Sequence, residues 1–93
     1  DYKASIEWYQ KSAETGNEFA QQNIGMMYSR GLGVSQNMPI AYMWLDLAVD
    51  SELAGARVLR DQIGVEMTPE QLDVVRTLKR TFMKKNAGLS DGE

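Results

Sequence analysis

The sequence predicts an all-α protein, an α–α superhelix of antiparallel helix hairpins closed by a C-terminal capping helix. Apolar residues recur at intervals of three and four along five segments, and none shows the sustained two-residue alternation typical of strands. The chain also repeats itself weakly after 36 residues, with Trp8 falling on Trp44. The expected helices cover residues 2–15, 18–30, 38–51, 53–65 and 69–86.

The first two helices are delimited by glycines. Helix 2–15 carries one apolar stripe, and Gly16 follows it. Helix 18–30 ends before Gly31, which we expect in a left-handed conformation, while Gly33 permits the tight turn that follows. The stretch from Gly31 to Gly33 lacks the third glycine, the lysine and the preceding strand of a phosphate-binding loop. The stripe of helix 2–15 consists of Tyr2, Ile6, Tyr9 and Ala13.

The third helix has a broad apolar face, which predicts that neighbours pack on more than one side of it. It begins after Asn37, a good capping residue, and Trp44 is expected in the core. The fourth helix, 53–65, aligns with helix 18–30 under the 36-residue shift, so that Ala20 falls on Ala56. The broad face consists of Ile40, Ala41, Trp44, Leu45, Leu47 and Ala48.

The last helix begins with a capping box, because Thr68 is followed three residues later by Gln71. One side of this helix is apolar and the other is basic, an amphipathic pattern. The apolar side carries Leu72, Val75, Leu78 and Phe82, and the basic side carries Arg76, Lys79, Arg80 and Lys84.

Residues 20–34 (AQQNIGMMYSRGLGV) resemble the first helix and loop of a Sel-one-like repeat, a relative of the tetratricopeptide hairpin. Residues 37–49 resemble its second helix, and residues 1–17 the second helix of a preceding unit. Ser5 and Ser12 depart from the usual alanines of that pattern. In the second copy Asp61 and Gly64 replace Gly25 and Tyr28, and no similar loop follows.

The resemblance implies a right-handed solenoid spanning residues 1–86. Because the chain begins at Asp1, we expect a processed or truncated product with an open N-terminal end. The expected parts are the second helix of a truncated unit (1–16), a full unit (17–52), a degenerate helix (53–67), a capping helix (68–86) and a flexible tail (87–93).

Composition excludes several kinds of chemistry. The 93 residues contain no cysteine and no histidine. The chain therefore cannot be a zinc finger, an iron–sulfur protein, a cysteine protease, a disulfide-stabilised scaffold or a hydrolase with a serine–histidine–aspartate triad. We therefore expect no catalytic residue, no metal and no cofactor. No apolar run approaches the ~20 residues of a membrane span, so we expect a soluble protein, with cytoplasm and periplasm left open. Solubilising charge is the expected role of the carboxylates Glu7, Glu14, Glu18, Asp46, Asp50, Glu52, Asp61 and Glu66.

The resemblance implies a protein-interaction scaffold whose partner, a protein or peptide, binds the concave face lined by the first helix of each hairpin. Met26 suits such a face because its thioether adapts to different partners. The alternative is that the residues at the inward positions are ordinary surface residues with no partner. By analogy with the tetratricopeptide pattern the inward positions are Phe19, Gln22, Met26, Ser29, Arg30, Val58 and Gln62.

Trp8 and Tyr9 lie on a helix whose own hairpin partner is not in the sequence. We expect one of them to be partly exposed, and covered by upstream repeats or a second copy. Self-association through this end is one consequence.

Two alternatives to the binding role remain open. The chain could be a purely structural C-terminal cap of a longer array. The basic segment 76–85 could instead contact nucleic acid or an anionic membrane, although the net charge of −3 argues against a nucleic-acid binder. We favour a simpler interpretation of the basic segment, in which cations near a helix C-terminus offset the negative end of the helix dipole.

Overall fold

In the computed structural model, residues 2–50 and 54–86 are described, and they form five α-helices and no strand. The all-α prediction is confirmed, and no described helix boundary differs from its expected position by more than one residue. The expected tail 87–93 lies outside the described residues, as do residues 51–53. The helices are α1 (Tyr2–Glu14), α2 (Glu18–Arg30), α3 (Met38–Asp50), α4 (Ala54–Gly64) and α5 (Pro69–Asn86).

Three helices begin with a capping side chain. The Oδ1 atoms of Asn17 and Asn37 each accept a hydrogen bond from the backbone N–H three residues on, at 2.9 and 3.0 Å. The expected capping box is also present, since Gln71 N donates to Thr68 Oγ1 (3.1 Å) and Thr68 N donates to Gln71 Oε1 (2.9 Å). Each such cap stabilises its helix by about 1 kcal/mol.

The loop after α2 needs two glycines with positive φ. Gly31 ends α2 at φ 69°, in the left-handed conformation expected from the sequence, and Gly33 has φ 76°. A Cβ atom on Gly33 would lie 2.8 Å from the backbone carbonyl of Tyr2. The loop therefore closes directly onto the start of α1, and only glycine fits there without strain.

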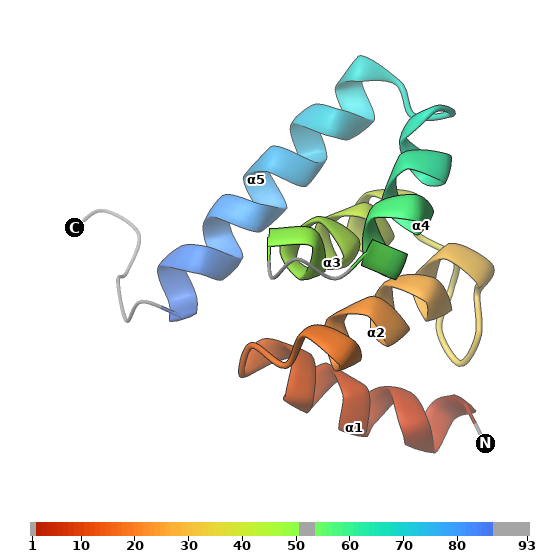
Figure 1. Cartoon of the computed structure of the whole chain (residues 1–93), viewed down its shortest axis with the longest axis vertical. Helices are drawn as coiled ribbons and strands as arrows, with labels where there is room; N and C mark the ends of the chain where they lie inside the picture. Colours follow the sequence, from red (N-terminus) through yellow and green to blue (C-terminus); the bar gives the residue numbers. More distant parts are fainter. Residues whose placement is uncertain (1, 51–53, 87–93) are drawn as a thin grey trace.

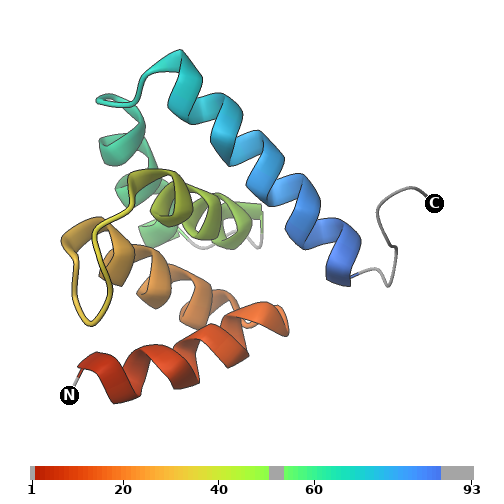
Figure 2. The same cartoon turned by 180° about the vertical axis from the view of Figure 1, so that it is seen from behind.

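From α1 to α4 each helix packs on the next one along the chain, whereas α5 packs on α3. α1 packs mainly on α2, while α3 packs against α2, α4 and α5 (Figures 1 and 2). α2 and α4, which align under the 36-residue repeat, contact each other directly. α5 runs past α3 along the edge of the molecule (Figure 1).

The core lies around α3. Trp44 is only 3% exposed, as expected, and its ring meets Phe82 of α5 edge to face with centroids 5.0 Å apart. Leu45 and Ala48 pack with Ala56 of α4 in a second cluster. The main cluster of buried side chains contains Ile6, Ala13, Ala20, Ile24, Met27, Met43, Trp44, Leu47 and Val75.

Candidate protein-binding face

The seven residues expected on the concave surface come from the two neighbouring helices α2 and α4. Phe19, Gln22 and Met26 follow one another at spacings of three and four, so they share one side of α2. Val58 and Gln62 are four apart and likewise share one side of α4. We call the set the α2–α4 face: Phe19, Arg30, Val58 and Gln62 are exposed, whereas Gln22, Met26 and Ser29 are half-buried.

Gln22 lies where α2 approaches α4. A Cβ atom on Gly55 would be only 2.9 Å from Gln22 Nε2, so the glutamine side chain covers the start of α4. Its amide therefore occupies the seam between the helices rather than projecting freely. Gln22 contributes to the packing of α2 on α4 as well as to the face.

Ser29 is committed to the end of α2. Its Oγ donates a hydrogen bond to the Met26 carbonyl at 2.7 Å, and its own carbonyl accepts one from Gln36 Nε2 at 2.9 Å. The hydroxyl oxygen keeps lone pairs for a partner, but its proton is already used.

One end of the face continues into a groove of about 260 Å³ where the ends of α2 and α4 meet the starts of α3 and α5. It brings together Ser29 and Gln62 of the expected set. The remaining lining residues were not expected, because they come from helix ends that the 36-residue repeat does not align with the face. Two thioethers, an aliphatic side chain, amides and one carboxylate line it, from Ser29, Met38, Gln62, Ile63, Glu66, Met67 and Gln71.

A cluster of charges holds the helices that carry this face. Asp46 of α3 accepts hydrogen bonds from Arg60 Nη1 of α4 and Lys79 Nζ of α5, both at 2.8 Å. Lys79 also donates to Asp50 at 3.0 Å. Asp46 is thus not simply a solubilising charge, as its place on a polar helix face had suggested: it is half-buried and joins three helices.

The pKa shifts follow from this arrangement. Burial raises the pKa of Asp46, but hydrogen bonds from Lys79 and Arg60, with their positive charges, outweigh it and leave the pKa below its ordinary value. Burial lowers the pKa of Lys79, and the bonds to Asp46 and Asp50 reverse this to a net rise. The hydrogen bond to Asp46 raises the pKa of Arg60. All three groups are held in their charged forms at neutral pH.

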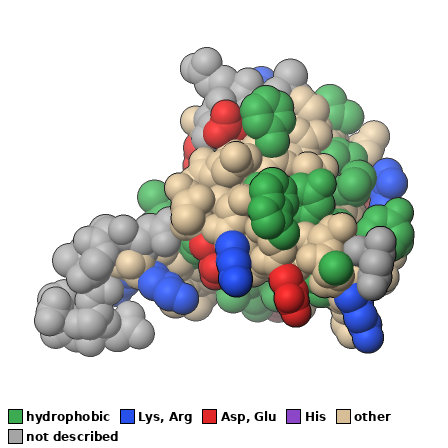
Figure 3. Space-filling view, turned by 90° about the horizontal axis from the view of Figure 1, so that it is seen from below, with side chains coloured by type: hydrophobic (Ala, Val, Ile, Leu, Met, Phe, Trp, Pro, Cys, Tyr) green, Lys and Arg blue, Asp and Glu red, His purple; other side chains and the backbone are tan. Residues whose placement is uncertain are grey.

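The aromatic pair of α1 lies at the surface. Trp8 is 63% exposed and Tyr9 is half-buried, which confirms the prediction of partial exposure. The two rings meet edge to face with centroids 5.2 Å apart. Figure 3, viewed from the α1 end, shows hydrophobic side chains among the charged ones on this surface.

These features define an all-α helical repeat protein of the solenoid class. The Sel1 repeat family model matches residues 1–17 and 19–52, more than half of the chain. The chain therefore belongs to the Sel1 repeat family, as the resemblance in its sequence indicated. Proteins of this family are typically non-catalytic scaffolds, and their repeats generally mediate protein interactions.

A solved structure supports the same fold. The chain is similar to c5321, a protective antigen present in uropathogenic Escherichia coli strains whose crystal structure displays an SLR fold. The TM-score is 0.85 at 27% sequence identity, over 95% of this chain. The match spans only 19% of that protein's length. No curated protein matches the chain significantly. None of the helices within residues 2–50 and 54–86 has the length and apolar character needed to cross a membrane.

Proposed function

We propose that this chain is a non-catalytic protein-interaction scaffold that holds a protein or peptide partner on the α2–α4 face without a cofactor. The observation that carries the proposal is the exposure of two large apolar side chains on adjacent helices. Phe19 is 62% exposed and Val58 is 57% exposed. Apolar side chains presented on rigid helices favour partner binding, because covering them releases water without ordering a loop.

The rest of the face supports a polypeptide partner. Met26 lies on the same side of α2 as Phe19, and the groove at the end of the face adds two further thioethers, which adapt to side chains of different shape. Gln62 offers an amide that can donate to and accept from a peptide backbone. Arg30 and Glu66 supply one charge of each sign near this end.

We further propose the division of the chain set out from the sequence. Residues 17–52 act as one full unit, 53–67 as a degenerate helix and 68–86 as a cap. The contact between Trp44 and Phe82 supports the capping role, because α5 covers a core residue of α3 that a following unit would otherwise cover. Self-association through Trp8 and Tyr9 belongs to the same proposal.

The binding role is tested by selecting peptides from a displayed random library on the immobilised chain and measuring their affinity for variants. Phe19→Ser and Val58→Ser together should weaken the selected peptides by about tenfold or more, because central apolar anchors dominate binding. Val74→Ser is the matched control, since Val74 is an exposed valine on α5 outside the face. Both variants should keep the helical circular dichroism and unfolding midpoint of the parent.

Two results would contradict the proposal. If the selected peptides bind the Phe19 and Val58 variant with unchanged affinity, they are recognised at a site other than the α2–α4 face. If no peptide is selected and deleting residues 69–86 only unfolds the chain, the purely structural role as a cap is the better description.

A further inference from the structure

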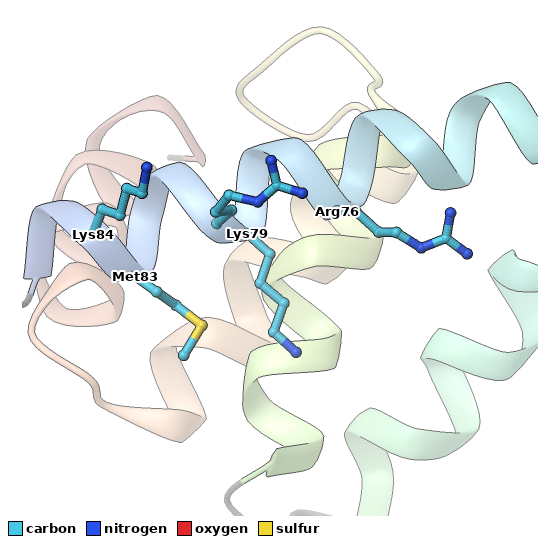
Figure 4. A pocket seen from close by; sticks show the side chains of 5 residues that line it. Arg76, Lys79, Met83 and Lys84 are labelled. Carbon is cyan, nitrogen blue, oxygen red and sulfur yellow. The ribbon is translucent and has the colours of Figure 1, made fainter. Parts of the chain in front are cut away.

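The basic side of α5 carries a furrow that the α2–α4 face does not use. Among the described residues it is lined by Arg76, Lys79, Arg80, Met83 and Lys84, and it is a shallow depression of about 560 Å³, open to solvent. These residues form two rows on the helix surface, with Arg76, Arg80 and Lys84 four apart in one and Lys79 and Met83 four apart in the other. Figure 4 shows Lys79 and Met83 pointing to the same side of α5, with Lys79 reaching toward α3.

Helix stability accounts for only part of this charge. The dipole effect is confined to the last turn, which holds Lys84 and Lys85. Lys79 is explained by its ion pairs with Asp46 and Asp50, and Arg76 forms a pair with Asp73. Arg80 lies outside the last turn, has no ion pair within residues 2–50 and 54–86, and stands four residues from cations on both sides. Like charges at this spacing destabilise an isolated helix.

The furrow also has an apolar component. Met83 is 55% exposed, and the surface between the two rows is mostly carbon, from Met83 and the aliphatic stems of the cations. A groove between rows of side chains spaced four residues apart is where a ridge of a second helix packs.

We propose that this furrow is a second docking site, which receives an acidic amphipathic helix of a partner protein. Carboxylates four residues apart on that helix pair with Arg80 and Lys84, and an apolar side chain between them rests on Met83. The charge of the site is complementary to such a helix, and its shape accommodates a helix ridge.

The same surface fits nucleic acid and membranes poorly. Base stacking needs exposed aromatic rings, and the aromatic ring of this helix, Phe82, is packed against Trp44. A membrane-bound helix buries a broad apolar face, but the apolar side of α5 is turned to α3, where Val75 is buried. Residues 1–75 carry eleven acidic and five basic groups, which repel an extended polyanion.

The test measures fluorescence anisotropy of a labelled helical peptide with glutamates four residues apart around a leucine. A peptide with glutamines in their place is the charge control. We expect the glutamate peptide to bind more tightly, and Arg80→Gln with Lys84→Gln to weaken it by about fivefold to tenfold. Met83→Ser should weaken both peptides equally, and added salt should weaken only the glutamate peptide.

The matched control is Lys11→Gln with Arg57→Gln, which removes the same charge from exposed positions on α1 and α4. It should leave peptide affinity unchanged, as should Phe19→Ser with Val58→Ser, which separates this site from the α2–α4 face. Equal loss in the Lys11 and Arg57 variant would overturn the proposal by revealing general charge attraction. Tighter binding to anionic vesicles or single-stranded DNA, lost with Arg80 and Lys84, would overturn it in favour of those ligands.

Discussion

At the scale of single residues, close helix packing depends on Gly25. Although it lies in the middle of α2, where glycine weakens a helix, a Cβ atom there would lie 2.8 Å from Leu45 Cγ and 3.2 Å from the Ala41 carbonyl oxygen. Leu45 is fully buried and the carbonyl belongs to α3, so neither can move aside freely. The missing side chain is what lets α2 and α3 approach.

We therefore expect Gly25→Ala to destabilise the fold despite its better helix propensity. Alanine gains up to ~1 kcal/mol in a helix interior, whereas overpacking costs ~1–3 kcal/mol, so the net loss should be about 1 kcal/mol. Urea unfolding followed by circular dichroism measures it.

Gly55→Ala is the matched comparison. A Cβ atom there meets only the end of the flexible Gln22 side chain, so this variant should keep or slightly raise stability. If Gly25→Ala is as stable as Gly55→Ala, close packing does not explain the glycine.

At the scale of helices, Asp46 joins α3 to both α4 and α5. The carboxylate and its two cations are each less than a quarter exposed, so they are shielded from solvent more than most surface pairs. Removing the carboxylate leaves Arg60 and Lys79 half-buried without their main partner.

Asp46→Asn should therefore cost about 1–2 kcal/mol of unfolding free energy at neutral pH. Because folding lowers the pKa of Asp46, its contribution is present above the unfolded value of ~3.9 and is lost as pH falls through the folded pKa. The parent and the variant should thus converge in stability on acidification.

The same linkage acts with opposite sign on Lys79. Folding raises its pKa, so its contribution is complete below the unfolded value of ~10.4 and is lost as pH rises through the folded pKa. Urea unfolding measured from acidic to alkaline pH gives the free energy of unfolding at each pH, and so checks the loss expected at low pH for Asp46 and at high pH for Lys79. Asp73→Asn is the control, because Asp73 and Arg76 form an exposed pair that contributes little. A constant difference between parent and Asp46→Asn at all pH values would contradict this account.

The helices also show what the sequence could and could not predict. The capping residues Asn37 and Thr68 act within three residues of their own position, so the helix starts could be located from local pattern alone. Asp46 and Lys79 are 33 positions apart, and no periodicity links them. Their contact depends on how α5 crosses α3, which only the packed structure defines. The groove at the end of the α2–α4 face was missed for the same reason.

At the scale of the whole molecule, the two tryptophans occupy equivalent positions 36 residues apart but opposite environments. α3 lies among α2, α4 and α5, so Trp44 is buried, whereas α1 packs mainly on α2 and Trp8 is 63% exposed. By equivalence with Trp44, the repeat predicts that Trp8 is buried. Trp8 would be buried only where a further helix covers α1. Within the described residues no helix does so.

Trp8 should therefore fluoresce at longer wavelength than Trp44 and be quenched by acrylamide at low protein concentration. Trp8→Phe removes its signal, and the spectrum that remains should be that of a protected residue, with stability changed by less than ~1 kcal/mol because little packing is lost. Trp44→Phe should lower the free energy of unfolding by more, since the ring contact with Phe82 is buried.

If copies of the chain associate through α1, raising the protein concentration should shift the Trp8 emission to shorter wavelength while sedimentation reports larger species. Protection of both tryptophans at the lowest concentration would show that α1 is covered within a single chain, and would remove the basis for self-association at this end.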